Sequence, residues 1–226
     1  MTTARDSRDA RRTPRADAKR AGEKRTRLNP QARRTQLIEL GVRMLATRTL
    51  DELSVDDIAA EAGISRGLLF HYFGSKQEFY VAVARAAAAD LIARTEPDTR
   101  LEPVEVLRHS LEAFIAYVEE KPDAYKSLVR GAGGGDADLR ALHTETRAAL
   151  ADRVVRVASE LGFALDETAV LAVHGWVAMV EECTIGWLDS RAISRAQLQE
   201  MLARALPVLI LAASDTDLDN LVALLA

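Results

Sequence analysis

The segment that most constrains this chain is residues 54–76, SVDDIAAEAGISRGLLFHYFGSK, which has the pattern of two short helices joined by a tight turn. Ser54 and Asp57 form a capping box, in which a serine at the cap and an acid three residues later satisfy otherwise unpaired backbone amides. Gly63 follows where a left-handed residue would end the first helix, and Ser65 caps the second. This layout is that of a helix-turn-helix motif, which predicts binding to duplex DNA.

The second of these helices is predicted to have one inner and one outer face. Leu69 and Phe73 lie four residues apart and should face the core. The other positions include large apolar and aromatic side chains, which a major groove would explain because thymine methyls take apolar contacts and base edges take hydrogen-bond donors. The alternative is a helical hairpin with a partly apolar surface. The predicted outer face consists of Ser65, Arg66, Gly67, Leu68, Phe70, His71 and Tyr72.

The outer residues have different predicted roles. Arg66 can reach guanine or phosphate, and Gly67 allows the helix backbone to approach the phosphates closely. His71, Tyr72 and Lys76 are placed to bind the DNA backbone, which fixes the register of a reader without specifying sequence.

The same stretch resembles the DNA-binding domain of the TetR family of bacterial transcriptional regulators. The matching residues are Ser54-Val55-Asp57-Ile58-Ala59, Ala62-Gly63-Ile64-Ser65, Arg66-Gly67-Leu69-Phe70-Tyr72-Phe73 and Ser75-Lys76. Phe70 stands where the family often has a tyrosine, so a hydrogen bond from that hydroxyl is not expected. The resemblance also implies phosphate contacts at the start of the preceding helix, from Arg34 and Thr35, and we include Ser54 in the predicted DNA-binding set.

Charge is distributed unevenly along the chain. The 226 residues carry a net charge of −4, yet residues 1–34 contain twelve Arg and Lys against four Asp and Glu. Binding to DNA must therefore rest on local basic patches rather than on the field of the whole protein. Cys183 is the single cysteine, which suits a reducing compartment, and with no apolar signal sequence evident we expect a cytoplasmic protein that does not enter the membrane.

The pattern of apolar residues predicts an all-α fold with an N-terminal reader joined by a linking helix to a helical body. We expect a disordered basic arm at 1–28, which either solubilises the chain or adds DNA contacts. A three-helix reader should occupy 29–76 and the body 77–226, with the linking helix at 75–94. The body helices are expected at about 103–120, 122–130, 137–161, 166–188 and 194–213, with a glycine-rich loop at 131–135 and an acidic, then apolar tail from Asp215.

The body is predicted to bind a small molecule and to form a homodimer, both as the resemblance implies. Apolar helices mixed with a few polar groups suit a ligand cavity, although His143, Trp176 and Met179 each fit an ordinary core or surface role as well. Trp187 and the face from Leu206 to Leu211 are expected at the dimer interface, the alternative being a monomeric core. The predicted ligand-binding residues are Phe114, Tyr117, Tyr125, Leu128, His143, Arg147, Trp176, Met179 and Cys183.

The function expected is that of a ligand-responsive regulator, a repressor that binds a palindromic operator as a dimer and is released by a small, apolar molecule. The alternative is an architectural DNA-binding protein without an effector. An enzyme is not expected, because the four histidines lie on separate predicted helices and no G-x-S-x-G, H-E-x-x-H or C-x-x-C motif is present. No cofactor and no metal site are predicted.

Overall fold

The computed structural model describes residues 29–133 and 136–213, and within these ranges the chain forms nine helices and no strand. The all-α prediction is therefore confirmed for the described chain. The predicted arm at 1–28 and the tail from Asp215 lie outside the described residues. The helices are α1 (Pro30–Met44), α2 (Val55–Glu61), α3 (Arg66–Phe73), α4 (Lys76–Arg94), α5 (Pro103–Glu120), α6 (Pro122–Gly133), α7 (Ala137–Glu160), α8 (Glu167–Ser190) and α9 (Arg195–Ala213).

The helix starts are encoded locally, by side chains that cap free backbone amides. Ser54 Oγ accepts a hydrogen bond from the amide of Asp56 at 3.1 Å, which opens α2. Ser65 Oγ accepts from the Leu68 amide at 3.2 Å and opens α3. The Asn29 side chain caps α1 in the same way. These polar caps explain why the predicted starts of the helices agree closely with the observed ones.

The glycine-rich segment differs from the prediction. We expected a helix ending at Arg130 and a loop over 131–135, but α6 continues through Gly131 to Gly133. Each glycine in a helix costs about 1 kcal/mol relative to alanine, so local preference favours an earlier end. Packing of α6 against α7 outweighs this preference. Residues 134 and 135 lie outside the described chain.

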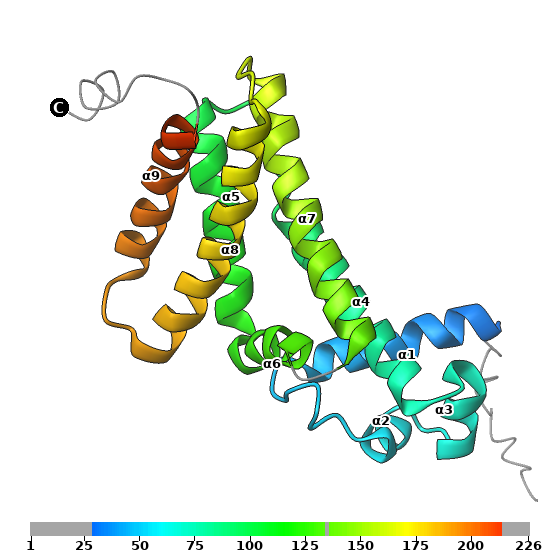
Figure 1. Cartoon of the computed structure of the whole chain (residues 1–226). Helices are drawn as coiled ribbons and strands as arrows, with labels where there is room; N and C mark the ends of the chain where they lie inside the picture. The colour runs from blue at the N-terminus through cyan, green and yellow to red at the C-terminus, as the bar shows by residue number, and fades with distance from the viewer. Residues whose placement is uncertain (1–28, 134–135, 214–226) are drawn as a thin grey trace, which may run out of the picture.

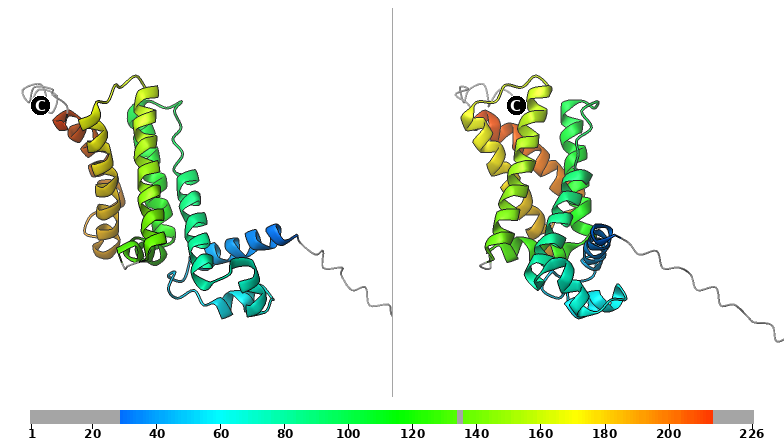
Figure 2. Two further views of the ribbon diagram at one scale, coloured as in Figure 1. Left: turned by 45° about the vertical axis from the view of Figure 1, so that its right-hand side comes forward. Right: turned by 90° about the vertical axis from the view of Figure 1, so that its right-hand side faces the viewer.

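The helices form two units arranged end to end (Figures 1 and 2). We call α1–α3 and the adjoining part of α4 the reading unit, and α5–α9 the body. The long helices α5, α7, α8 and α9 run beside one another, while the short α6 lies at the end of the body nearest the reading unit. This arrangement places α3 at one extremity of the molecule and the loop between α7 and α8 at the other.

One apolar core runs beneath α3 and along α4. Leu69 and Phe73 are 0% and 2% exposed, as predicted, and both belong to a buried cluster that extends along α4 to Ala87. The Tyr80 hydroxyl donates to the carbonyl of Leu53 and ties α4 to the loop before α2. From Leu91 onward α4 contributes instead to the core of the body. The linking helix therefore belongs to both units.

The body touches the reading unit through α6 and α7 as well as through α4. Ala124 and Leu142 are part of the apolar cluster beneath the reading unit. Arg85 on α4 pairs with Glu145 on α7 at 3.5 Å. The predicted linking helix α4 therefore joins the two units along the chain, and side chains of α6 and α7 add packing contacts to its first half.

Helices α8 and α9 pack against each other and keep apolar side chains on their outer surfaces. Leu171 is 72% exposed and Met201 is 44% exposed. Both helices are long and apolar enough to cross a membrane by length and composition, a test that core helices of soluble proteins also pass. Trp187, expected at a dimer interface, is instead 5% exposed within the chain and donates to the Ile193 carbonyl at 2.8 Å.

Candidate functional site

The reading helix α3 exposes only part of its predicted outer face. Leu68 is 39% exposed, and His71 is also exposed. Phe70 and Tyr72 are instead half-buried and pack against the reading-unit core. The prediction placed both fully outward, but an apolar stripe about 100° wide or more includes the residues beside Leu69 and Phe73. Their polar or aromatic edges remain the part available at the surface.

Arg66 is exposed at the first turn of α3. Its Nη1 lies 3.1 Å from a carboxylate oxygen of Asp56 on α2, and its guanidinium lies 5.6 Å from the centre of the Phe70 ring. The arginine and aspartate side chains are 61% and 64% exposed. An exposed ion pair contributes about 0–1 kcal/mol, so Arg66 can exchange Asp56 for a phosphate or a base edge at little cost.

Gly67 lies in open space on the surface of α3. A Cβ atom built at this position would meet no heavy atom within 4 Å. A glycine inside a helix costs roughly 0.5–1 kcal/mol relative to alanine, and within the described residues no packing contact requires the absence of a side chain here. Close approach by a partner outside the chain gives the glycine a physical reason.

Cationic side chains flank α3 on the neighbouring helices. Lys76, at the start of α4, holds its Nζ 4.9 Å from the centre of the Tyr80 ring. Arg34 on α1 places its guanidinium 4.8 Å from the centre of the Phe73 ring, and Thr35 beside it is exposed. Arg34, Arg66 and Lys76 thus bring positive charge from three helices to the surroundings of α3. The predicted residues Ser54 and Ser65 act as helix caps in this structure.

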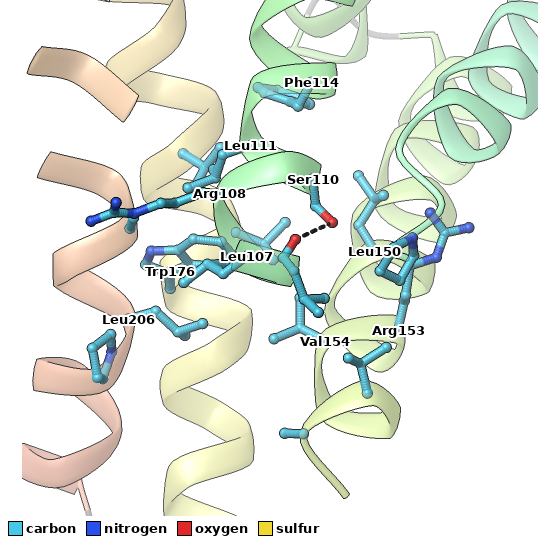
Figure 3. Close-up of a pocket in the computed structure, with 18 of the residues that line it drawn as sticks. Leu107, Arg108, Ser110, Leu111, Phe114, Leu150, Arg153, Val154, Trp176 and Leu206 are labelled. Atoms are coloured by element: carbon cyan, nitrogen blue, oxygen red, sulfur yellow. Dashed lines mark hydrogen bonds between the residues drawn. The ribbon is translucent and has the colours of Figure 1, made fainter. Parts of the chain in front are cut away.

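The body contains a partly open cavity of about 600 Å³ (Figure 3). A volume of this size suits a small organic ligand, for which pockets of about 300–1,000 Å³ are usual. Its wall is mostly aliphatic and aromatic and comes from α5, α7, α8 and α9. Lining residues include Leu107, Ser110, Leu111, Phe114, Leu150, Val154, Val157, Leu161, Trp176, Val177, Val180, Leu206 and Ile210.

A polar cluster lies at the Glu181 side of the cavity. The Glu181 carboxylate is 2.9 Å from His143 Nε2 and accepts a hydrogen bond from the Tyr125 hydroxyl at 3.4 Å. Burial, with the nearby Glu181 charge, raises the pKa of Tyr125 well above its usual value. The tyrosine therefore stays protonated and able to donate, and the buried carboxylate has two partners.

Arg153 joins the cavity wall to the end of α4. Its Nη1 donates to the Ile92 carbonyl at 2.8 Å and lies 3.2 Å from Thr95 Oγ1, while Nη2 pairs with Glu96 at 2.8 Å. Arg153 and Thr95 both line the cavity. Arg153 therefore connects the cavity wall directly to the backbone at the last turn of α4.

The structure brings four of the nine predicted ligand-binding residues to the cavity wall. These four are Phe114, Tyr125, Arg147 and Trp176. Phe114 and Tyr125 contact each other edge to face, with ring centres 6.0 Å apart. The Trp176 indole is oriented by a hydrogen bond from Nε1 to the Leu202 carbonyl at 2.9 Å.

The other five predicted residues lie outside this wall. The Tyr117 hydroxyl donates to the Ala87 carbonyl at 2.8 Å, which directs the side chain to α4. Leu128 packs against the reading-unit core. His143 contacts Glu181, which lines the cavity.

Met179 and Cys183 pack against the apolar cluster of the body and do not line the cavity. Burial raises the pKa of the Cys183 thiol, and the charge of Glu182 adds to the effect. A raised pKa reduces the thiolate fraction, which is the reactive form.

Sequence reasoning missed most of the aliphatic wall. Leu107 and Leu111 on α5 follow the helical apolar pattern, and Leu150 and Val154 on α7 do likewise. Helical periodicity identifies an inward face but does not say whether another side chain or an empty space lies opposite. Arg153 and Glu181 carried no pattern that marked them.

Both parts of the chain match known protein families. Residues 37–83 match the model for bacterial regulatory proteins of the tetR family, and residues 103–209 match the tetracyclin repressor-like C-terminal domain. The chain belongs to the TetR family. The two matched segments coincide with the reading unit and the body, and the rest of α4 lies between them.

Individual relatives agree with this assignment. The transcriptional activator FasR of Mycolicibacterium smegmatis is 28% identical over 188 residues, covering 76% of this chain and 84% of FasR. The transcriptional repressor KstR2 of the same organism is 35% identical over 94 residues, covering 41% of this chain and about half of KstR2 (46%). A TetR-family regulator from Streptomyces coelicolor has a crystal structure that superposes with a TM-score of 0.73 at 27% identity, covering 88% of this chain and 97% of that one.

As a TetR-family member, the chain is a DNA-binding transcriptional regulator and not an enzyme. TetR-family regulators commonly dimerise and bind small-molecule effectors. The reading unit of this TetR-family protein presents α3 with its flanking cations, and its body contains a cavity large enough for such a molecule.

Proposed function

We propose that this protein is a homodimeric repressor that binds a palindromic operator through α3 and leaves it when a small, apolar molecule enters the body cavity. It acts in the cytoplasm, where its operator is. The observation that carries the proposal is the cavity of about 600 Å³, which shares Arg153 and Thr95 with the contact that holds the end of α4. A ligand at this wall can change the position of α4 and therefore of α3.

Dimerisation through α8 and α9 is supported by their outer surfaces. Leu171 and Met201 are exposed, and Ala205 and Val208 lie on the same outer groove of α9 as Met201. Apolar area of this kind is stabilised by burial against a second copy. Two copies then place two reading helices about 34–36 Å apart, in successive major grooves on one side of the DNA.

The DNA contacts are proposed for the exposed groups at α3 and its flanks. Arg66 and Leu68 face base edges, while Lys76, Arg34 and Thr35 bind phosphates. The edges of Phe70 and Tyr72 and the exposed His71 complete the surface. Ser54 and Ser65 contribute the amino-terminal ends of α2 and α3, where backbone amides favour phosphate.

Release by a ligand follows from linkage. A ligand shifts the equilibrium between two shapes only by the ratio of its affinities for them. In the conformation of the body that allows operator binding, Arg153 keeps its contacts with the end of α4. Repression follows when the dimer occupies a promoter and blocks polymerase.

Selection of genomic fragments by the purified protein tests this proposal. Fragments retained by the protein are expected to share a palindrome, and a metabolite extract should release them. Transcription from a promoter that carries the fragment should fall on adding the protein and recover on adding the extract. Retention of fragments without a common sequence and without release would support an architectural protein. A rise in transcription on adding the protein would identify an activator.

A further inference from the structure

One stripe of α7 forms a wall of the cavity. The residues three or four apart along this stripe are Arg147, Leu150, Val154, Val157 and Leu161. Four of the five are aliphatic, as the wall of an apolar cavity requires. Arg147 ends the stripe with a guanidinium group, which apolar surroundings disfavour unless an anion accompanies it.

Three other charged groups of the wall have partners. Arg153 pairs with Glu96 at 2.8 Å, and Arg108 pairs with Glu200 at 2.8 Å. Glu181 accepts from both His143 and Tyr125.

Arg147 differs from these groups. It is half-buried, and within residues 29–133 and 136–213 it forms no hydrogen bond or ion pair through its side chain. Arg204 is a second lining arginine without such a partner in the same ranges, but it is exposed on α9, where water hydrates it. The half-buried, unpaired cation of the wall is therefore Arg147.

We propose that the effector is a hydrophobic anion whose carboxylate pairs with Arg147 while its hydrocarbon part fills the cavity. This inference rests on the proposed function. A guanidinium offers two parallel N–H donors that match the two oxygens of a carboxylate. A cationic ligand would have to pair with Glu181. The carboxylate of Glu181 already contacts Tyr125 and His143, which disfavours such a ligand.

The position of Arg147 also sets the orientation of the ligand. Helix α7 begins near the reading unit and ends at the far end of the body (Figure 1), and Arg147 precedes Leu161 along it. Fourteen residues of helix separate them, or about 21 Å. Phe163 and Val104, which also line the cavity, are 53% and 58% exposed. The carboxylate therefore lies at the inner end and the hydrocarbon points toward these exposed apolar residues.

Three probes of equal chain length test the inference by calorimetry at pH 7, namely decanoate, decanol and decylamine. They differ in head-group charge and share the hydrocarbon. The wild-type protein is expected to bind decanoate at least about ten-fold more tightly than decanol, since hydrogen bonds to charged groups contribute more than neutral ones. Decylamine is expected to bind weakest.

Substitutions of Arg147 and of a control arginine test which residue binds the carboxylate. Arg147→Met should reduce the affinity for decanoate about ten-fold or more and leave that for decanol within about two-fold. Arg147→Lys, which keeps the charge but not the planar fork, should lie between Arg147→Met and the wild type. Arg140→Met, on an exposed position of the same helix, is the control and should change neither affinity. Retention of a selected genomic fragment shows that each variant is folded.

Several outcomes would overturn the inference. Tightest binding of decylamine would assign recognition to Glu181, and loss of decanoate binding in Arg204→Met alone would move the head group to α9. Equal binding of all three probes would reject the proposed preference for an anionic head group, while the cavity would remain the proposed effector site. Absence of binding by every probe, in a protein that still retains DNA, would remove both this inference and the proposed ligand response.

Discussion

The core beneath α3 is closely packed, whereas the body contains a cavity. In the reading unit Leu53, Ile58, Leu69 and Phe79 are each fully buried. In the body Leu150 and Val154 are only partly buried, because they face a space of about 600 Å³. Unfilled volume forfeits contacts that would otherwise stabilise a packed core. We therefore expect the reading unit to keep its shape and the body to be the part that can adopt a second one.

The two cores meet along α4. Its side chains as far as Ala87 pack into the reading unit, and Leu91 packs into the body. Tyr117 donates to the Ala87 carbonyl between them, and Arg153 holds the last turn. We therefore expect movement of the body to reach α3 through α4, whose first half packs into the core of the reading unit.

The largest expected effect comes from truncating the packed core. Leu69→Ala should lower the free energy of unfolding by about 2–5 kcal/mol, because a cavity forms where packing is complete. Leu150→Ala should cost less than half as much, since its neighbours already border an open space. Urea denaturation of both variants measures the difference. Equal losses would contradict the contrast between the two units.

A charge introduced on the outer surface of α9 tests whether the body forms the dimer interface. Val208→Asp should separate the dimer, because an unpaired charge buried between copies costs several kcal/mol. Ala149→Glu, on an exposed position of α7, is the control and should leave the dimer intact. Sedimentation at micromolar concentration distinguishes them. A monomeric wild-type protein would reject the proposed dimer, and with it the proposed palindromic operator.

The link between the units is expected to depend on Arg153. Arg153→Met removes three polar contacts with the end of α4 but keeps an apolar side chain in the wall. Operator affinity should then respond to the ligand less than in the wild type, by about 1–3 kcal/mol of coupling. Fluorescence anisotropy of labelled operator, with and without ligand, measures this. Unchanged coupling would place the link elsewhere along α4.

The DNA-facing charges should act more modestly. Lys76→Ala should weaken binding to all sequences alike and reduce the slope of log affinity against log salt by roughly one. Arg100→Ala, in a loop of the opposite end of the molecule, should leave the slope unchanged. A Lys76→Ala slope equal to that of the wild type would reject this phosphate contact.

The smallest effects are expected at Gly67, where one substitution should change stability and operator affinity in opposite directions. Gly67→Ala should stabilise the protein by up to about 1 kcal/mol, because alanine favours the helix and meets no neighbour. The same methyl should weaken operator binding if DNA approaches the α3 backbone. Thermal unfolding and anisotropy are measured on the same sample. Unchanged or tighter DNA binding would show that the glycine is not needed for close approach.

Much of the reading unit could be predicted from sequence because its determinants are local. Ser54 and Ser65 cap helices within three residues of themselves, and Leu69 with Phe73 defines an inner face. The degree of burial of Phe70 and Tyr72 depends on contacts across the unit, and there the prediction failed in part.

The cavity is a product of tertiary packing, and the sequence carries no local sign of it. Phe114, Tyr125, Arg147 and Trp176 were predicted at the site, but Tyr117 was drawn to the Ala87 carbonyl thirty residues away. Hydrophobic periodicity says which side of a helix faces inward. It does not reveal a space between inward faces, nor that Arg147 forms no ion pair within the part of the chain that the structure describes.

Calorimetric titration of the ligand, with and without saturating operator, tests the central claim most directly. The operator and ligand are those that the genomic selection recovers. Linkage requires that operator weaken ligand binding by the same factor by which the ligand weakens operator binding. We predict equal factors of about 5–150, the usual range of such coupling. Identical ligand affinities in the two titrations would contradict the claim that the cavity governs DNA binding.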